Sequence, residues 1–221
     1  ISLKDFRDRP LGSAIYNPAS LIVARRISRR RQDLDLDFFL RRIGRAIEFR
    51  QRLPLDEGLC RLVWSESDGI PGLIVDRYRE HLVVQALTLA MHQRLETITA
   101  ALRELLSPAS IILRNDSPVL RAEGLEPEIR TLDGTAPGAF EVDAEGLRYE
   151  VDLVDGQKTG LYLDQLGNHA EVARLAAGKR VLDCFTNQGG FALACARAGA
   201  ARVTAIDISA AACEATRRNA A

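Results

Sequence analysis

Two aspartates and a pair of glycines are spaced for ligand binding in "VLDCFTNQGGFALACARAGAARVTAIDIS", residues 181–209. Asp183 ends one apolar run, Gly189 and Gly190 form a turn, and Asp207 closes a second apolar run. In a doubly wound sheet, ligands bind outside the carboxyl ends of the strands, where a glycine-rich turn lets the backbone approach them. Asp207, eighteen residues after Gly189, is placed to accept two hydrogen bonds from a ribose diol. The spacing therefore predicts a site for a nucleotide-like ligand.

The charge of the ligand separates two candidates. A dinucleotide site uses G-x-G-x-x-G to bring a helix N-terminus to a pyrophosphate, whereas the pattern here is D-x-F-x-x-x-G-G-F. Asp183 would repel a pyrophosphate, but it suits the cationic amino group of S-adenosylmethionine, which also carries a ribose and no phosphate. We therefore expect S-adenosylmethionine, with NAD as the alternative. A ligand-free turn, in which the glycines only permit tight packing, also stays open.

The elements that position these residues follow from apolar spacing. Short apolar runs at Val181–Asp183 and Val203–Ile206 predict strands, and Phe191–Ala198 between them has helical spacing. Strands that alternate with a helix in this way are typical of a parallel sheet. We expect an α/β fold that begins a Rossmann-like sheet.

The preceding segment predicts a helix and a strand. The helix runs from about Asp164 to Ala177, with Gly178 as its C-terminal stop. Alternation through Tyr149 and Val151 is typical of a half-buried antiparallel strand.

The N-terminal half predicts an α+β arrangement. Its apolar runs are short, rich in Val, Leu and Ile, and separated by Pro and Gly turn signals. In chain order we expect strands on either side of Asn17-Pro18, a helix at 37–53 capped by the preceding aspartates, strands within 60–87 with turns at 68–69, 71–72 and near 78, a helix at 93–106, a strand at 109–116, and a loop or linker over 123–138.

Basic residues gather near the N-terminus. Residues 1–52 hold thirteen Lys and Arg against six Asp and Glu, and the remainder holds seventeen against twenty-four. Such asymmetry is the footprint expected where a protein meets a polyanion. A solvated arginine-rich surface explains the cluster equally well. The candidate RNA-binding residues are Arg25, Arg26, Arg29, Arg30 and Arg31.

Several classes of protein and site do not fit the sequence. The four cysteines lack paired C-x-x-C spacing and the three histidines lie far apart, so we expect neither a disulfide framework nor a metal site. No apolar stretch is long enough for a membrane span, and the N-terminus has charges where a signal peptide has its apolar core. We expect a cytoplasmic protein. The chain starts without Met and stops within a helix-like pattern, so we also expect it to be part of a longer protein.

Four segments that follow one another along the chain resemble those of a known protein family. They are "GSAIYNPASLIVARRIS", "ESDGIPGLIVDRY", "DGQKTGLYLDQ" and the segment 181–209 quoted above. Together they resemble the bacterial PUA-domain-containing family of class I methyltransferases that act on large-subunit ribosomal RNA, commonly forming 5-methylcytosine. The resemblance implies that residues 1–31 are the remnant of a PUA-like β domain, that 32–135 form an α+β middle domain, and that 136–221 form the N-terminal half of the methyltransferase domain.

The resemblance also assigns roles residue by residue. Asp207 becomes the ribose acid, and the segment around Lys158, Thr159 and Tyr162 closes over the cofactor. Turn and cap chemistry explains Lys158 and Asp164 as well as ligand contact does. The first cofactor motif comprises Asp183, Phe185, Gly189, Gly190 and Phe191.

Methylation of cytosine at carbon needs a thiolate, because the ring carbon becomes reactive only after a nucleophile adds to its neighbour. Cys184 lies inside the first cofactor motif, where a small apolar residue at a strand end is the better interpretation. The resemblance places the attacking cysteine beyond residue 221. A noncatalytic RNA-binding or assembly module stays as an alternative, and a homodimer is one way to cover the edge of a half sheet.

Overall fold

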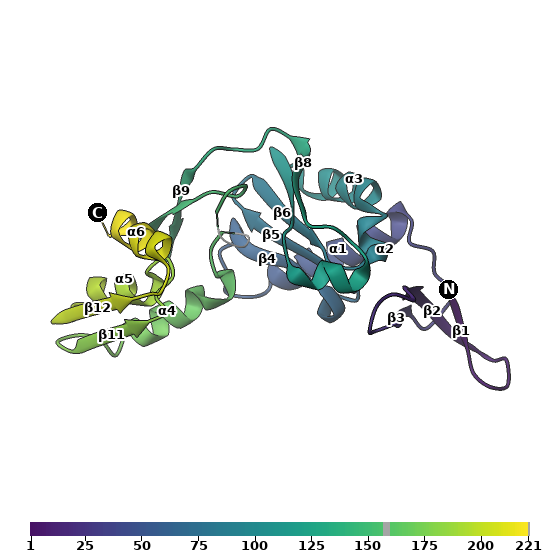
Figure 1. Cartoon of the computed structure of the whole chain (residues 1–221), viewed down its shortest axis with the longest axis horizontal. Coiled ribbons are helices and arrows are strands. Elements are labelled where there is room, and N and C mark those ends of the chain that lie inside the picture. The colour runs from purple at the N-terminus through teal and green to yellow at the C-terminus, as the bar shows by residue number, and fades with distance from the viewer. Residues whose placement is uncertain (157–159, 221) are drawn as a thin grey trace. The chain divides into compact units, whose positions relative to one another are not determined.

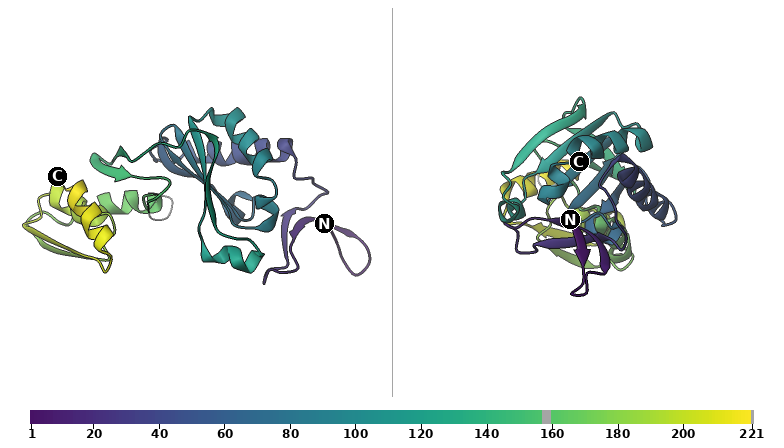
Figure 2. Two further views of the ribbon diagram at one scale, coloured as in Figure 1. Left: turned by 45° about the horizontal axis from the view of Figure 1, so that its top comes forward. Right: turned by 90° about the vertical axis from the view of Figure 1, so that its right-hand side faces the viewer.

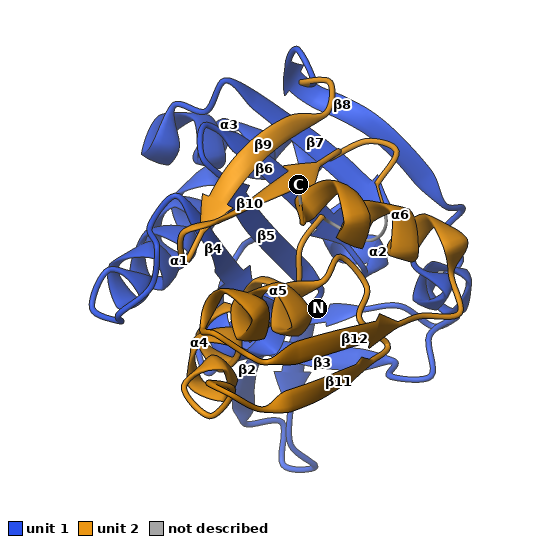
Figure 3. Ribbon diagram, turned by 90° about the vertical axis from the view of Figure 1, so that its left-hand side faces the viewer, with its two compact units in different colours: residues 1–136 blue, residues 137–221 orange. Residues whose placement is uncertain are grey.

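The computed structural model, shown in Figure 1 and from two further sides in Figure 2, describes residues 1–156 and 160–220. The chain divides into two compact units, residues 1–136 and residues 137–221 (Figure 3).

The first unit begins with a three-stranded antiparallel sheet, in the order β1 (Ser2–Lys4), β2 (Pro10–Tyr16) and β3 (Ala24–Ser28). Gly12 has a φ of +126°, and a Cβ at this position would overlap the carbonyl oxygen of Ser28. Glycine is therefore needed at this position of β2, where the backbone lies against the end of β3. The predicted strands on either side of Asn17-Pro18 are confirmed.

A five-stranded mixed sheet forms the body of the first unit. Its order is β4-β5-β6-β7-β8, and β6 and β7 run parallel while the other neighbours run antiparallel. The helices and strands of this part are α1 (Leu36–Arg50), β4 (Leu59–Trp64), η1 (Ser65–Asp68), β5 (Leu73–Tyr78), β6 (His81–Ala86), α2 (Leu89–His92), α3 (Leu95–Leu106), β7 (Ser110–Asn115), η2 (Pro118–Glu123) and β8 (Glu128–Gly134).

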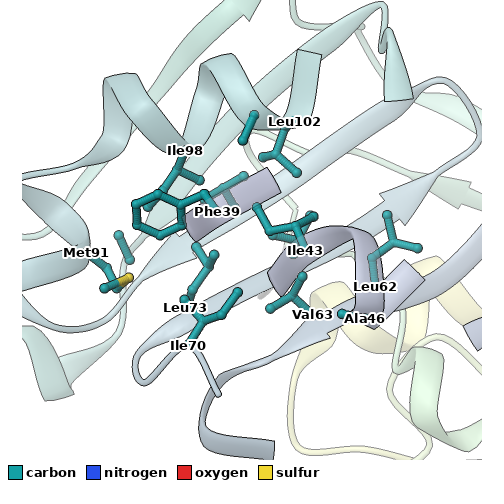
Figure 4. Close-up of a cluster of buried hydrophobic side chains, with 14 of the residues drawn as sticks. Phe39, Ile43, Ala46, Leu62, Val63, Ile70, Leu73, Met91, Ile98 and Leu102 are labelled. Atoms are coloured by element: carbon teal, nitrogen blue, oxygen red, sulfur yellow. The ribbon is translucent and has the colours of Figure 1, made fainter. Parts of the chain in front are cut away.

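Helix α1 begins where the sequence predicts, because Asp35 caps it. The Asp35 carboxylate accepts a hydrogen bond from the backbone N–H of Phe38 at 2.9 Å. The apolar stripe of the helix then packs into a core that Figure 4 shows in close-up, where Phe39 and Ile43 meet Ile98 and other side chains of the sheet and of α3. This cluster is closed to solvent and fixes the helices on one face of the sheet.

The prediction of a loop or linker over 123–138 is wrong for its central part. Residues Glu128–Gly134 form β8, which pairs antiparallel with β7 along the edge of the sheet. Most of its side chains are exposed or only partly buried, so the strand lacks the apolar alternation by which it could have been predicted. It is stabilised by backbone hydrogen bonds to β7, a contact that its own composition does not indicate.

The second unit combines a hairpin with a strand-helix-strand motif. Strands β9 and β10 pair antiparallel, and β11 and β12 pair parallel. Helix α5 packs on β11 and β12, α4 packs against α5, and α6 packs against β10. The elements are β9 (Phe140–Ala144), β10 (Leu147–Val151), η3 (Leu163–Gln165), α4 (Leu166–Ala173), β11 (Arg180–Cys184), α5 (Gly190–Arg197), β12 (Arg202–Ile206) and α6 (Ala210–Asn219).

The predicted strands and helices of the second unit are confirmed, with bounds that differ by a few residues. The mixed α/β architecture with its parallel pair is the predicted Rossmann-like arrangement. In the part of the chain that the structure describes, no helix is both long and apolar enough to cross a membrane.

Candidate functional site

The turn after β11 has unusual backbone geometry. Phe185 and Asn187 have φ values of +62° and +52°, and Gly189 has +88°. For the two non-glycine residues this conformation is unfavourable, and such residues are often found at functional sites. Two hydrogen bonds hold the turn in this form. The backbone N–H of Thr186 donates to the Ile206 carbonyl at 3.0 Å, and the Thr216 hydroxyl donates to the Asn187 carbonyl at 2.9 Å.

Asp183 at the end of β11 accepts hydrogen bonds that stabilise this turn. Its Oδ2 accepts a hydrogen bond from the Thr186 hydroxyl at 2.6 Å and one from the backbone N–H of Ala192 at 3.1 Å. Because Ala192 lies in the first turn of α5, the carboxylate satisfies one of the free donors at that helix N-terminus. Asp183 therefore fixes the start of α5 relative to β11.

Asp207 follows β12 directly and is also held by backbone groups. Its two oxygens accept hydrogen bonds from the backbone N–H of Ser209 at 2.9 Å and of Asn187 at 3.0 Å. These bonds, that of Ser209 first, lower the pKa of the Asp207 carboxyl below its usual value. The group is thus a carboxylate at neutral pH, and a carboxylate has about four acceptor sites, more than these backbone groups use.

A cavity of about 490 Å³ lies beside the turn, with all of its lining residues in the second unit. This volume is in the range of sites for small molecules. The wall combines apolar side chains, aromatic rings and a few polar groups. Its lining residues are Tyr149, Leu161, Tyr162, Asp164, Gln165, Leu166, His169, Phe185, Thr186, Asn187, Gln188, Gly190, Phe191 and Asp207.

Gln188 contributes an unsatisfied acceptor to this cavity. Its side-chain Nε2 donates to the Gly160 carbonyl at 3.3 Å, whereas its Oε1 is buried without a hydrogen-bond partner among the described residues. A buried acceptor without a partner is unfavourable unless a ligand or water supplies a donor.

Gly190 leaves room for the imidazole of His169. A Cβ at position 190 would overlap the His169 ring, which also contacts Phe191 edge-on with ring centroids 4.4 Å apart. Burial lowers the pKa of His169 below its usual value of 6.5, although Asp183 and Asp164 oppose the shift. The sequence offered no motif for His169, because its role depends on α4 packing against α5.

The structure brings together most of the site residues predicted from sequence. Asp183 and Gly189 do not line the cavity. They stabilise the turn after β11, Asp183 by its hydrogen bond from Thr186 and Gly189 by its positive φ. Lys158 and Thr159 lie outside the described residues. The predicted residues that line the cavity are Tyr162, Phe185, Gly190, Phe191 and Asp207.

No cysteine is among the described residues that line the cavity. Cys184 is exposed on β11, Cys195 is buried, and Cys213 lies on α6 with its thiol near the Asp207 carbonyl at 3.7 Å. Burial, with a contribution from Asp183, raises the pKa of the Cys195 thiol. A raised pKa disfavours the thiolate, so the surroundings of Cys195 suit a packing role and not a nucleophilic one.

The five candidate RNA-binding arginines of the first unit differ in their surroundings. Arg25 is half-buried, forms an ion pair with Glu66 at 3.0 Å and lies 3.9 Å from the carboxylate of Glu123. Its guanidinium is therefore less available to a phosphate than the sequence suggests. The exposed members of the cluster are Arg26, Arg29, Arg30 and Arg31. Within the described residues, no group of three or more His, Cys, Asp or Glu side chains could hold a metal ion.

Comparison with known proteins identifies the family. The model of the S-adenosylmethionine-dependent methyltransferase family matches residues 73–221, which is more than half of the chain. The chain belongs to this family. The cofactor of such methyltransferases is S-adenosylmethionine, which was the expected ligand, and this finding decides against the NAD alternative.

Two relatives agree with this assignment. The chain is 34% identical over its whole length to "Ribosomal RNA large subunit methyltransferase I" of Vibrio cholerae, covering 56% of that protein. It is 40% identical over 192 residues to the protein of the same name from Aeromonas salmonicida, with 86% of this chain and 48% of the relative covered. The chain thus spans about half the length of the relatives it matches.

Solved structures of methyltransferases share the fold. A structure named "A putative sam-dependent methyltransferase from Streptococcus mutans" matches 99% of this chain and 57% of its own, with a TM-score of 0.83 and 24% identity. A second methyltransferase structure, which contains SAH, matches 99% of this chain and 56% of its own, with a TM-score of 0.85 and 24% identity.

Proposed function

We propose that the cavity of the second unit binds S-adenosylmethionine, with the ribose hydroxyls on Asp207. The observation that carries the proposal is the position of this ionised carboxylate at the cavity edge, directly after the second parallel strand. A carboxylate in this place accepts two hydrogen bonds from a ribose diol. Asn187 and Gln188 add polar side chains to the wall of the same cavity.

The bound cofactor would supply a methyl group on a sulfonium, which a nucleophilic atom of the substrate accepts. The chain's own contribution is to orient and enclose it. Aromatic side chains of Tyr162, Phe185 and Phe191 give apolar walls for the adenine, while Asp183 holds the helix start against which the cofactor lies. Such positioning is a large part of the catalytic effect in a transfer reaction.

We further propose ribosomal RNA as the substrate, with carbon 5 of a cytosine in large-subunit RNA as the methylated atom. Support comes from the relatives named large-subunit ribosomal RNA methyltransferases and from the exposed arginines Arg26, Arg29, Arg30 and Arg31. Exposed guanidinium groups suit phosphate contacts. In this proposal the attacking cysteine does not belong to the described cavity, because no cysteine lines it.

The proposed organisation follows the same resemblance. Residues 1–31, with the β1-β2-β3 sheet, are the remnant of a PUA-like domain, and residues 32–135 form the α+β middle domain that precedes the methyltransferase half. The cytoplasm is the proposed location, and a homodimer is a proposed assembly.

Replacement of Asp207 tests the cofactor assignment. We expect Asp207→Ala to weaken S-adenosylmethionine and SAH binding alike by about 1.5 to 3 kcal/mol, roughly ten- to a hundredfold, because both ligands carry the ribose. Isothermal titration calorimetry gives both affinities. Asp207→Glu, which keeps both acceptor oxygens but moves them by one methylene, shows whether the position of the carboxylate matters as well as its charge. Glu214→Ala is the control, since Glu214 is an exposed carboxylate on α6 that does not line the cavity. Unchanged affinity in Asp207→Ala would exclude the assignment.

A further inference from the structure

His169 is fixed within the wall of the cofactor cavity. It lies on α4, and its ring is wedged between the Gly190 backbone and the edge of Phe191, at 4.4 Å between ring centroids and an interplanar angle of 78°. Because both neighbours belong to the start of α5, the imidazole cannot leave the wall without disturbing the helix that the cofactor approaches. A charge on this ring would therefore act directly on a bound ligand.

Titratable groups surround the ring on the elements packed around it. Asp183 of β11 and Asp164 of η3 interact with His169 electrostatically, and Asp207 after β12 lines the same cavity. Tyr149 of β10 lines both this cavity and a second one, of about 230 Å³, which His169 also lines. There the facing groups are Glu145, from the turn between β9 and β10, and Arg197 of α5, whose guanidinium donates to the Glu145 carbonyl at 2.6 Å. Cys195 of α5 is buried nearby on the same helix.

The ring is neutral at pH 7. Burial lowers its pKa below the usual 6.5, and Asp183 and Asp164 only partly offset this effect. A group whose pKa is lowered becomes protonated only when the pH falls below that value. As the pH falls below the pKa of the ring, therefore, protonation of His169 adds one positive charge to the cavity wall.

The two forms of the cofactor differ by one charge. S-adenosylmethionine carries a sulfonium, an ammonium and a carboxylate, so it has one net positive charge, whereas SAH has a neutral thioether and no net charge. We infer that His169 is a specificity-determining residue, because a positive charge on its imidazole disfavours the sulfonium cofactor more than the uncharged product SAH. The inference rests on the proposed binding of S-adenosylmethionine in this cavity.

The decisive measurement is the ratio of the two affinities at two pH values. Calorimetry on the 221-residue chain with S-adenosylmethionine and with SAH, at pH 7.0 and at a pH below the His169 pKa found by nuclear magnetic resonance titration, gives this ratio. We expect acidification to weaken S-adenosylmethionine roughly tenfold more than SAH, as a repulsion between two charges within one partly solvated cavity predicts. In His169→Gln, which cannot be protonated, the ratio should not change with pH. His92→Gln is the matched control, because His92 lies in the first unit, and it should behave as the unmodified chain does.

Nuclear magnetic resonance measures the pKa of each histidine ring, which ligand binding would not change if His169 had only a structural role. The chain has three histidines, His81, His92 and His169, so each ring can be assigned with a single variant. Saturation with S-adenosylmethionine should lower the pKa of His169 further than saturation with SAH does, and neither ligand should shift His81 or His92.

The outcomes separate the two proposals. If neither ligand binds at pH 7.0, the proposed function fails and this inference fails with it. If both ligands bind and their affinity ratio is independent of pH, only the inference on His169 is overturned. A ratio that changes with pH equally in His169→Gln would assign the effect to another group and would also overturn it.

Discussion

The two units differ in how much apolar surface they bury. In the first unit, Phe39, Ile43 and Ile98 are fully closed to solvent in one continuous core. In the second unit, Leu182 of β11 is 62% exposed, and Ile208, which follows β12, is 99% exposed. Because hydrophobic burial is the main favourable term in folding, substitutions in the continuous core of the first unit should affect stability most, whereas substitutions at the cavity of the second unit should affect ligand binding.

The largest effect on stability is expected from removing a buried side chain from the core of the first unit. Phe39→Ala should reduce the free energy of unfolding by about 3 to 5 kcal/mol, since it removes a fully buried ring. Urea unfolding followed by far-UV circular dichroism measures the change. Phe49→Ala on the same helix is the control, because Phe49 is 53% exposed, and should cost much less. Similar losses in both variants would contradict the concentration of stability in this core.

The next effect concerns Glu123, a buried carboxylate of the first unit that holds distant segments together. It accepts hydrogen bonds from Asn17 Nδ2 at 2.9 Å, Ser20 Oγ at 2.5 Å and the backbone N–H of Leu89 at 3.2 Å. Glu123→Gln turns one acceptor into a donor that faces other donors, and should cost about 1 to 3 kcal/mol at pH 7. The exposed Glu126→Gln is the control.

The pH dependence of that difference follows from the pKa of Glu123. Burial alone would raise it, but hydrogen bonds from Ser20 and Asn17 outweigh burial and lower it below the usual 4.5. A carboxyl with a lowered pKa stabilises the folded state above its unfolded pKa, and this contribution is lost as the pH falls. The stability difference between the unmodified chain and Glu123→Gln should therefore shrink below about pH 4.5. A difference that is constant with pH would show that the charge of Glu123 does not contribute.

A smaller effect, confined to binding, is expected in the second unit. Gly190→Ala places a methyl group against the His169 ring, which should displace the cavity wall and weaken S-adenosylmethionine roughly tenfold. Calorimetry measures the affinity. The control is Gly167→Ala on α4, where an added Cβ meets nothing within 4 Å and should leave the affinity unchanged. Equal affinities in the two variants would contradict the close contact between α4 and the start of α5.

The smallest effect per residue is expected from the exposed arginines. Replacing Arg26, Arg29, Arg30 and Arg31 with Gln should weaken binding to a large-subunit ribosomal RNA transcript, and each lost phosphate contact should flatten the log-log salt slope by somewhat under one unit. Filter binding at several salt concentrations measures the slope. Arg25→Gln should flatten the slope less, because Arg25 is already paired with Glu66. An unchanged slope in the fourfold variant would mean that the cluster is only a solvated surface.

The sequence alone predicted the local features of this protein. The apolar periods of α1, α3, β11 and β12 and the cap at Asp35 are set by neighbours within a few residues, so they can be read without a tertiary structure. The same holds for the turn, where Gly189 and Gly190 are followed at a fixed distance by Asp207. The charge of the expected ligand followed from acids that lie at strand ends.

What required the tertiary structure are contacts between residues far apart in the chain. Strand β8 forms through backbone pairing with β7 at the edge of the sheet. Arg25 is half-buried because the fold places Glu66 and Glu123 next to it. His169 joins the cavity only because α4 packs against α5, which sets its ring on Gly190 and Phe191. Local propensity and spacing determine which segments are helices and strands, but hydrogen bonds, burial and pKa depend on which of those segments meet.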